Sequence, residues 1–149
     1  MILAREPHAR DGYRLLTAAA RIVQRLQDEA LAPLGLTRAA VIALEAAAPS
    51  PLYQEQLAMK VHVQSQTLGR VLARLEEDGL VTRTRNPADR RQFRVQITEA
   101  GNAALQAARL AERAVVPADF DGWESLSEQL ARFVDFFQTP QQGTSGSGI

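Results

Sequence analysis

The sequence lacks cysteine altogether and contains only two histidines, His8 and His62. Without thiols the chain can form no disulfide, no thiol redox sensor and no cysteine-based zinc or iron–sulfur site. The two histidines lie far apart, with no carboxylate at metal-ligand spacing, whereas a metal site usually has three or four ligands. Paired carboxylates, a Ser-His-Asp arrangement and a phosphate-binding glycine loop are also missing. We therefore expect that the protein is not an enzyme, that it has no catalytic residue, and that it binds no metal and no cofactor.

Long apolar runs and a net charge are missing too. No stretch approaches the length of a membrane span, and the first ten residues lack the apolar segment of a signal peptide, so we expect a cytoplasmic protein without membrane contact. The formal net charge is zero. The charges are unevenly distributed, however: residues 60–94 carry eight Lys or Arg against four acids, and residues 95–149 carry three against seven. Contact with phosphates requires such a local basic patch and does not require a net positive charge of the whole protein.

The length of 149 residues and the 46% of apolar residues indicate one globular domain. Apolar residues recur at helical spacing over 8–31, 37–48, 53–60, 64–78, 98–116 and a last segment that reaches Phe137. Thr37 and Thr98 are expected N-caps, and Asp121 with Glu124 forms the expected capping pair of the last helix. Gly79 is a suitable residue to end the fourth helix. The Gly/Ser-rich residues 139–149 are expected to form a flexible tail.

A β-hairpin interrupts this helical pattern. Residues 80–85 and 92–97 alternate between apolar and polar positions, as strands do. The four residues Asn86 to Asp89 between them have turn chemistry, with Asn at the first position and Pro at the second. The predicted fold is therefore mainly α with a small β-hairpin wing. A winged helix-turn-helix occupies 37–98, and the helices in 1–36 and 99–138 form a dimerisation region.

The fourth helix has two different faces. Its core side is predicted from four apolar residues at helical spacing: Leu68, Val71, Leu72 and Leu75. The opposite face carries Gln66, Gly69, Arg70 and Ala73. Small residues there allow a close approach to a groove floor, and Gln and Arg can each contact base edges through two hydrogen bonds. The alternative is an ordinary exposed helix face, although a glycine inside such a helix costs about 1 kcal/mol relative to alanine.

The hairpin is rich in arginine. Five arginines lie within twelve residues, against the single acid Asp89: Arg83, Arg85, Arg90, Arg91 and Arg94. Arginine on a narrow tip suits the negative potential of a DNA minor groove. Asp89 can hold Arg91 by a forked ion pair. The alternative is a hairpin that uses charge only for solubility. The predicted DNA-binding residues are Gln64, Ser65, Gln66, Gly69, Arg70, Arg74, Arg83, Arg85, Asp89, Arg90 and Arg91.

The chain resembles the MarR family of regulators over roughly residues 12–105. Residues 79–91 (GLVTRTRNPADRR) and 95–101 (VQITEAG) resemble the wing signature of that family, and residues 34–37 (LGLT), 57–58 (LA) and 67–80 (TLGRVLARLEEDGL) fit it as well. The resemblance implies a homodimeric repressor whose first and last helices interlock and whose two winged helices bind double-stranded DNA at a pseudo-palindromic operator. It implies that the fourth helix reads the major groove, that Arg91 enters the minor groove, and that a small aromatic or phenolic effector releases the DNA.

Three residues depart from the family pattern. His62 stands where a glycine is common in the turn, Gln64 replaces the usual Ser or Thr cap, and Tyr53 stands where Thr or Ser often begins the third helix. For an anionic aromatic effector the candidate residues are Arg10, Tyr13 and Arg14, for which a place on the dimer surface is the alternative. The alternative function is a winged helix for protein interaction or DNA architecture, without an effector.

Overall fold

The computed structural model describes residues 6–139, with the side chains described from residue 8 onward. The predicted tail therefore lies, apart from Thr139, outside the described residues. The chain forms two compact units, residues 1–116 and residues 117–149. In the described part, no single helix is long and apolar enough to cross a membrane. Two consecutive helical segments reach the length and composition of a membrane span only when they are taken together, and the chain bends by 80° between them: His8–Leu34 and Arg38–Ala47.

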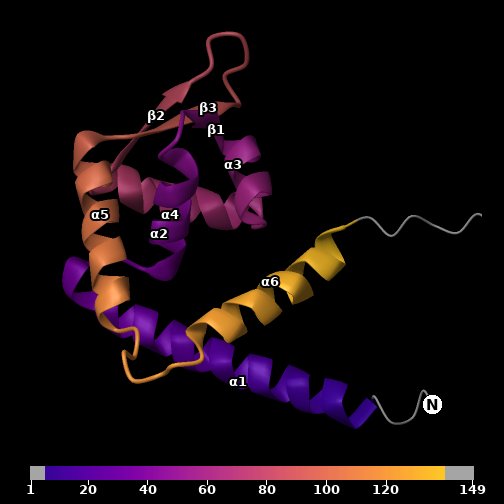
Figure 1. The fold of residues 1–149 in the computed structure, drawn as a ribbon. Coiled ribbons are helices and arrows are strands. Elements are labelled where there is room, and N and C mark those ends of the chain that lie inside the picture. Colours follow the sequence, from indigo (N-terminus) through magenta and orange to yellow (C-terminus); the bar gives the residue numbers. More distant parts are fainter. Residues whose placement is uncertain (1–5, 140–149) are drawn as a thin grey trace, which may run out of the picture. The chain divides into compact units, whose positions relative to one another are not determined.

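The first unit contains all elements but one (Figure 1). Its helices are α1 (Glu6–Leu31), the 3-10 turn η1 (Ala32–Leu34), α2 (Arg38–Ala47), α3 (Gln54–Val61), α4 (Ser65–Glu77) and α5 (Glu99–Ala114). Its strands are β1 (Leu52–Tyr53), β2 (Val81–Arg85) and β3 (Phe93–Ile97). The second unit contains α6 (Trp123–Gln138). The predicted fold class, mainly helical with a small β wing, is confirmed.

The core of the first unit is built around α2, which packs against α3, α4 and α5. The buried face of α2 consists largely of alanines, so the neighbouring helices can approach it closely. Large side chains fill the remaining space: Leu44 of α2 itself and, from the surrounding elements, Leu31, Leu57, Leu72, Leu75, Val81, Val95 and Leu105, all of them fully buried. Full burial of a leucine contributes about 2 kcal/mol relative to exposure. This core is the platform that carries α4 and the hairpin.

The sheet has three antiparallel strands in the order β1-β3-β2. In the hairpin, Val81 lies opposite Ile97 and Arg85 opposite Phe93. The strand β1 was not predicted, because two residues are too few to show an alternating pattern. Tyr53 belongs to β1 and precedes α3, and its backbone N–H donates to Gln56 Oε1 at 3.0 Å. The third helix therefore begins one residue later than expected, with a glutamine as its only side-chain cap.

Two of the three predicted side-chain caps are present. Thr37 Oγ1 accepts from Ala40 N at 3.1 Å, and Thr98 Oγ1 accepts from Gly101 N at 3.0 Å. The predicted cap by Asp121 is wrong, because the residue before α6 is Gly122 and no side chain caps that helix. Trp123 determines the local structure instead. Its indole N–H donates to Pro117 O at 3.1 Å, and its ring meets Phe120 edge-on at 5.0 Å between centroids.

The start of α5 is locked to the end of α4. Thr98 Oγ1 donates to Gly79 O at 2.7 Å, and Thr98 N donates to Leu80 O at 3.0 Å. Gly79 has φ +76°, the left-handed conformation expected of a glycine that follows a helix. A Cβ at Gly101 would overlap the carbonyl oxygen of Leu80, so only glycine fits at this position. The residues that follow α4 and the first turn of α5 are therefore held together by a close backbone contact.

Candidate nucleic-acid interface

The two faces of α4 lie as the apolar period predicts. Leu68, Leu72 and Leu75 are buried against the core, and Val71 is half-buried beside them. On the opposite side Gln66, Arg70 and Ala73 are exposed. A helix has room for an apolar face of about 100° and a polar face opposite. The exposed face of α4 therefore presents an amide and a guanidinium, two groups that can pair with base edges, next to a small side chain.

Gly69 has a different neighbour from the one expected of it. It is half-buried, and a Cβ placed there would lie 3.2 Å from Nε2 of Gln54 at the start of α3. A side chain at this position would press on Gln54 unless that side chain moved, so the contact of α4 with α3 is one reason for the glycine. The Oε1 atom of Gln54 is buried and has no hydrogen-bond partner within the described chain. Sequence reasoning had no signal for this contact, because α3 and α4 are joined through a turn whose geometry was unknown.

The turn before α4 is unusual at two residues. His62, which ends α3, has φ 56° and ψ 42°, and it is the only non-glycine residue with positive φ between residues 6 and 139. Gln64 precedes α4 but its side chain accepts no hydrogen bond from the helix. Both observations agree with the departures seen in the sequence. Gln64, Ser65 and Gln66 are all exposed, so they lie together at the open N-terminus of α4.

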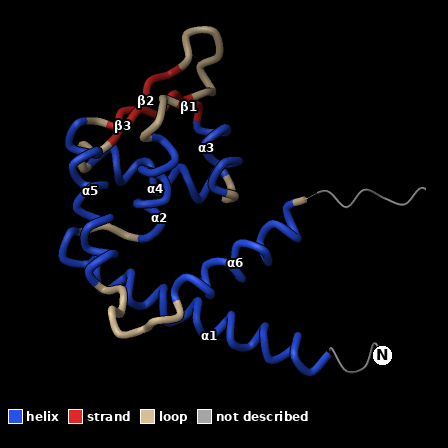
Figure 2. The backbone as a smooth tube through the Cα atoms, in the orientation of Figure 1, coloured by secondary structure: helices blue, strands red, loops and turns tan. Residues whose placement is uncertain are grey.

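The wing tip is an ordered loop. Figure 2 shows it extending from the sheet between β2 and β3. Asn86 Nδ2 donates to Gln92 Oε1 at 2.9 Å, and Asn86 Oδ1 accepts from Ala88 N at 3.0 Å. The backbone closes the same loop, with Asn86 N donating to Gln92 O at 2.8 Å and Gln92 N to Asp89 O at 3.0 Å. Asn86 thus opens the loop through its side chain, as its turn chemistry suggests, but the hydrogen-bonded turn spans Asp89 to Gln92 and not the predicted Asn86 to Asp89. Gln92 was not predicted as a partner of Asn86.

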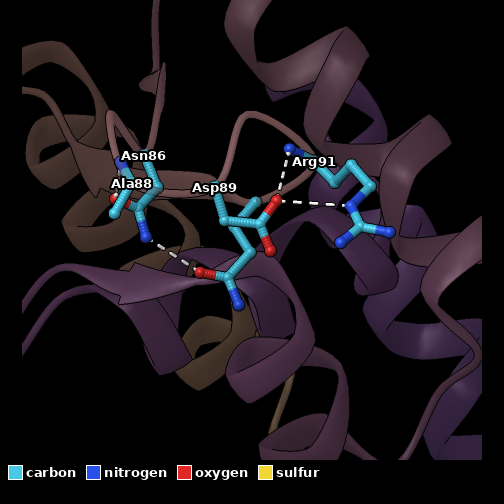
Figure 3. A network of polar contacts seen from close by, with 5 residues as sticks. Asn86, Ala88, Asp89 and Arg91 are labelled. Atoms are coloured by element: carbon cyan, nitrogen blue, oxygen red, sulfur yellow. Dashed lines mark hydrogen bonds and ion pairs between the residues drawn. The ribbon is translucent and has the colours of Figure 1, made fainter.

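Asp89 and Arg91 form the predicted ion pair, with a different geometry (Figure 3). Asp89 Oδ1 accepts from the Nε of Arg91 at 3.3 Å and from its backbone N–H at 3.1 Å. Both bonds reach one carboxylate oxygen, so the pair is not forked. The Nη groups of Arg91 stay outside the pair, and its side chain is 91% exposed. The carboxylate therefore orients the guanidinium and leaves its outer edge available to another acceptor.

The remaining basic residues differ in how far they are engaged within the chain. Arg74 pairs with Asp78 at 3.3 Å but stays largely exposed, and Arg90 is exposed. Arg85 is exposed and lies over the Phe93 ring, 5.2 Å from its centroid. Arg83 is only 18% exposed, and it is bonded to Glu76 of α4. The structure thus brings the predicted set together on α4 and the wing, with Gly69 and Arg83 partly covered.

Arg10, Tyr13 and Arg14 lie apart in sequence from this surface, on the first half of α1. The spacing of three and four residues places them on one side of that helix. All three are exposed, and the carbonyl of Tyr13 accepts from Thr17 Oγ1 at 2.9 Å. They form a group of two cations and one phenol on an open helix side.

The MarR family model matches residues 48–93, from the end of α2 through α3, α4 and the wing to the start of β3. The fold is similar to a MarR-family transcriptional regulator from Rhodococcus sp. RHA1, with 24% identity, a TM-score of 0.74 and coverage of 87% of this chain and 93% of that one. It is also similar to CouR from Rhodococcus jostii RHA1 bound to p-coumaroyl-CoA, with 26% identity, a TM-score of 0.71 and coverage of 85% and 90%.

A third similar structure is a mutant MarR from E. coli complexed with operator DNA. It shares 25% identity and a TM-score of 0.66, and the match covers 81% of this chain and 91% of that one. Three findings agree: the exposed face of α4, the arginine-rich wing with its Asp89–Arg91 pair, and a fold shared over most of the length of these similar structures. The family match therefore covers the winged-helix part of the chain, and the fold is similar to that of a MarR-family transcriptional regulator.

Proposed function

We propose that the protein is a homodimeric repressor that binds double-stranded DNA at a pseudo-palindromic operator. In this proposal α4 lies in the major groove and the wing in the adjacent minor groove of each half-site. The main support is Arg91, whose side chain is 91% exposed while its Nε donates to Asp89. A guanidinium held outward on a narrow hairpin suits the negative potential of a narrow minor groove. The similar E. coli regulator was solved with operator DNA.

The exposed face of α4 supports the reading of bases. Gln66 and Arg70 both carry planar groups that can make two hydrogen bonds with one base edge. Replacing a residue that contacts a base costs about 1–3 kcal/mol at one position of the site, whereas replacing a phosphate contact weakens binding to every sequence. We therefore expect Arg70→Ala to change the preferred DNA sequence.

Sequencing of the DNA that the protein selects from a random pool tests the proposal as a whole. The expected result is an enriched site with twofold symmetry, because a symmetric dimer presents two identical reading heads. The same experiment distinguishes the architectural alternative, which predicts bound DNA without an enriched sequence. A winged helix that serves protein interaction predicts no bound DNA at all, and that result would overturn the proposal.

The wing arginine gives a sharper prediction. Arg91→Ala should weaken operator binding by about 1–3 kcal/mol, roughly 5- to 150-fold, because the contact to the groove is lost. Asp89→Ala should reduce the ratio of the affinity for operator to the affinity for scrambled DNA. Freeing Arg91 weakens operator binding, whereas removing the repulsion between Asp89 and the phosphates strengthens binding to any DNA. Fluorescence anisotropy with both duplexes at one salt concentration measures these effects.

The matched control for both variants is Arg132→Ala on α6, which removes one exposed positive charge away from the wing sequence. It should change neither affinity by more than twofold. Equal tightening of operator and scrambled DNA by Asp89→Ala would mean that this carboxylate serves only the turn.

We assign dimerisation to the helices in residues 1–36 and 99–138. Both α1 and α6 carry large apolar side chains that the single chain does not cover, among them Leu15 at 70% exposed and Phe137 at 63%. Apolar stripes of this kind are typical of surfaces that a partner buries. In the proposal they are covered by a second copy of the chain.

We also propose that a small anionic aromatic compound releases the DNA. Arg10, Tyr13 and Arg14 supply two charges and a ring on one side of α1 that can receive such a compound. The first probe is p-coumaroyl-CoA, the ligand of the similar CouR structure. Release of labelled DNA on titration, lost in Arg10→Ala/Arg14→Ala, supports the assignment. Equal release in the variant would place the effector elsewhere and leave these residues to the dimer surface.

A further inference from the structure

We propose that Glu76 and Arg83 form a brace that fixes the angle between α4 and the wing, and that Arg83 is a positioning residue and not a phosphate contact. This inference rests on the proposed DNA-binding function and adds a role that the arginine count of the wing does not suggest. It separates Arg83 from the other wing arginines, which the sequence alone treats as one set.

The brace joins two elements through both oxygens of one carboxylate. Glu76 lies in the last turn of α4, and Arg83 is the middle residue of β2. Glu76 Oε1 accepts from Arg83 Nη2 at 3.3 Å, and Oε2 accepts from the backbone N–H of Arg83 at 3.2 Å. Because β2 is an outer strand of the sheet, its free side has no strand to bond with. The carboxylate therefore holds the strand itself and not merely a mobile side chain.

The guanidinium of Arg83 is enclosed as well as paired. It lies 5.3 Å from the centroid of the Phe93 ring on β3, and its Nε is buried without a hydrogen-bond partner in the described chain. A buried unpaired donor is unfavourable by about 1–3 kcal/mol, so this placement must be held by the surrounding contacts. To reach a phosphate, Arg83 would have to give up the bond to Glu76 and the contact with the ring.

Arg85 provides the contrast within the same strand. It lies over the same ring, 5.2 Å from the centroid, but it is exposed and has no carboxylate partner among the described residues. Two residues apart on one strand, the two arginines thus have different surroundings. Arg85 is available to the DNA backbone, whereas Arg83 is committed to α4.

A fixed angle matters because the two reading elements must engage neighbouring grooves at the same time. If the wing moved freely relative to α4, each binding event would have to restrict that motion, and affinity would fall. Loss of the brace should therefore weaken DNA binding without removing a phosphate contact. The two effects are separable, because each phosphate contact contributes about 0.9 to the slope of log K against log salt.

The first arm of the test needs no DNA. Since the chain has no cysteine, the exposed residues Ala73 on α4 and Ala88 in the wing can be changed to cysteine and spin-labelled without background. Electron-electron resonance then measures the distance distribution between the two labels. Glu76→Gln and Arg83→Met should each broaden it. Asp78→Asn is the matched control, because it removes the charge of the Arg74–Asp78 pair at the end of α4 and should leave the distribution unchanged.

The second arm measures binding to a fluorescein-labelled 30-bp duplex of random sequence at several salt concentrations. Arg83→Met should lower the affinity 3- to 10-fold with the wild-type salt slope, and Arg85→Met should lower the slope by about 0.9. Equal losses of slope in the two variants would overturn the positioning role. An unchanged label distribution in both Glu76→Gln and Arg83→Met would overturn the brace.

The two arms keep this inference separate from the proposed function. A wild-type chain that binds no DNA contradicts the function, while the label distances still decide whether the brace exists. Urea unfolding of each variant shows whether it is folded. If Arg83→Met does not fold, Glu76→Gln, which keeps the arginine and the ring contact, decides the question in both arms.

Discussion

His62 is the residue whose backbone departs furthest from what its side chain favours. Its φ of 56° lies in the left-handed region, where its N–H closes the end of α3 on the carbonyls of Ala58 and Met59. For an L-residue this conformation is unfavourable by about 1–2 kcal/mol, and glycine avoids that cost. The packing of the helix-turn-helix thus imposes a backbone conformation that histidine itself disfavours.

We predict that His62→Gly raises the free energy of unfolding by about 0.5–1 kcal/mol. The relief of strain should exceed the extra conformational entropy that a glycine adds to the unfolded chain. Urea titration measures the difference, and His62→Ala, which keeps the left-handed strain, is the control without an expected gain. A lower stability of the glycine variant would show that the imidazole makes a favourable contact in the turn.

At the scale of the element, α4 begins without a side-chain cap although it is the helix assigned to base reading. Gln64 has the extended backbone of a cap residue, with φ −68° and ψ 142°, but its side chain accepts no bond. The same helix is held firmly at its other end, where Asp78 N and Gly79 N are bonded to carbonyls of α4. The first turn of α4 is therefore its weaker end.

Gln64→Ser should stabilise the protein by about 0.5–1.5 kcal/mol, because a serine hydroxyl can accept from the N–H groups of the first turn. Thermal unfolding monitored by circular dichroism measures the change. The control is Gln66→Ser, which makes the same substitution at an exposed position inside the helix and should give no gain. Equal gains at both positions would mean that the effect comes from losing glutamine and not from capping.

The sequence predicted those elements whose pattern is long enough to repeat. The buried face of α4, the caps at Thr37 and Thr98 and the side-chain bond of Asn86 in the wing loop all follow from local chemistry, and they are present. It could not predict β1, which has only two residues. The brace from Glu76 to Arg83 was equally out of reach, since both residues look like exposed charges until the angle between helix and hairpin is known.

On the scale of the whole molecule, the single chain leaves the apolar stripe of α6 exposed to solvent. Its partly exposed members are Trp123, Leu126, Leu130, Phe133, Val134 and Phe137. A stripe so rich in aromatic residues exceeds what a lone helix needs, and aromatic residues are enriched in interfaces between subunits. This is the basis on which we assign α6 to the dimer.

Leu130→Glu should convert the dimer into a monomer, because a carboxylate at the middle of the stripe would be buried without a partner. Sedimentation should then give 16.3 kDa, against about twice that mass for the wild type. Ser125→Glu adds the same charge on the opposite side of α6 and should leave the dimer intact. A wild-type chain that sediments as a monomer and still binds operator tightly would remove α6 from the interface.

The contact between Trp123 and Pro117 has a spectroscopic consequence. Trp123 is the only tryptophan of the chain, and its indole N–H is held at the beginning of α6, in a different unit from α4 and the wing. Tryptophan fluorescence therefore reports on the surroundings of Trp123 at the start of α6. Its change on dilution gives the association constant of two copies without any label. A change in tryptophan emission on adding an operator would not come from a tryptophan of α4 or the wing, because neither contains one.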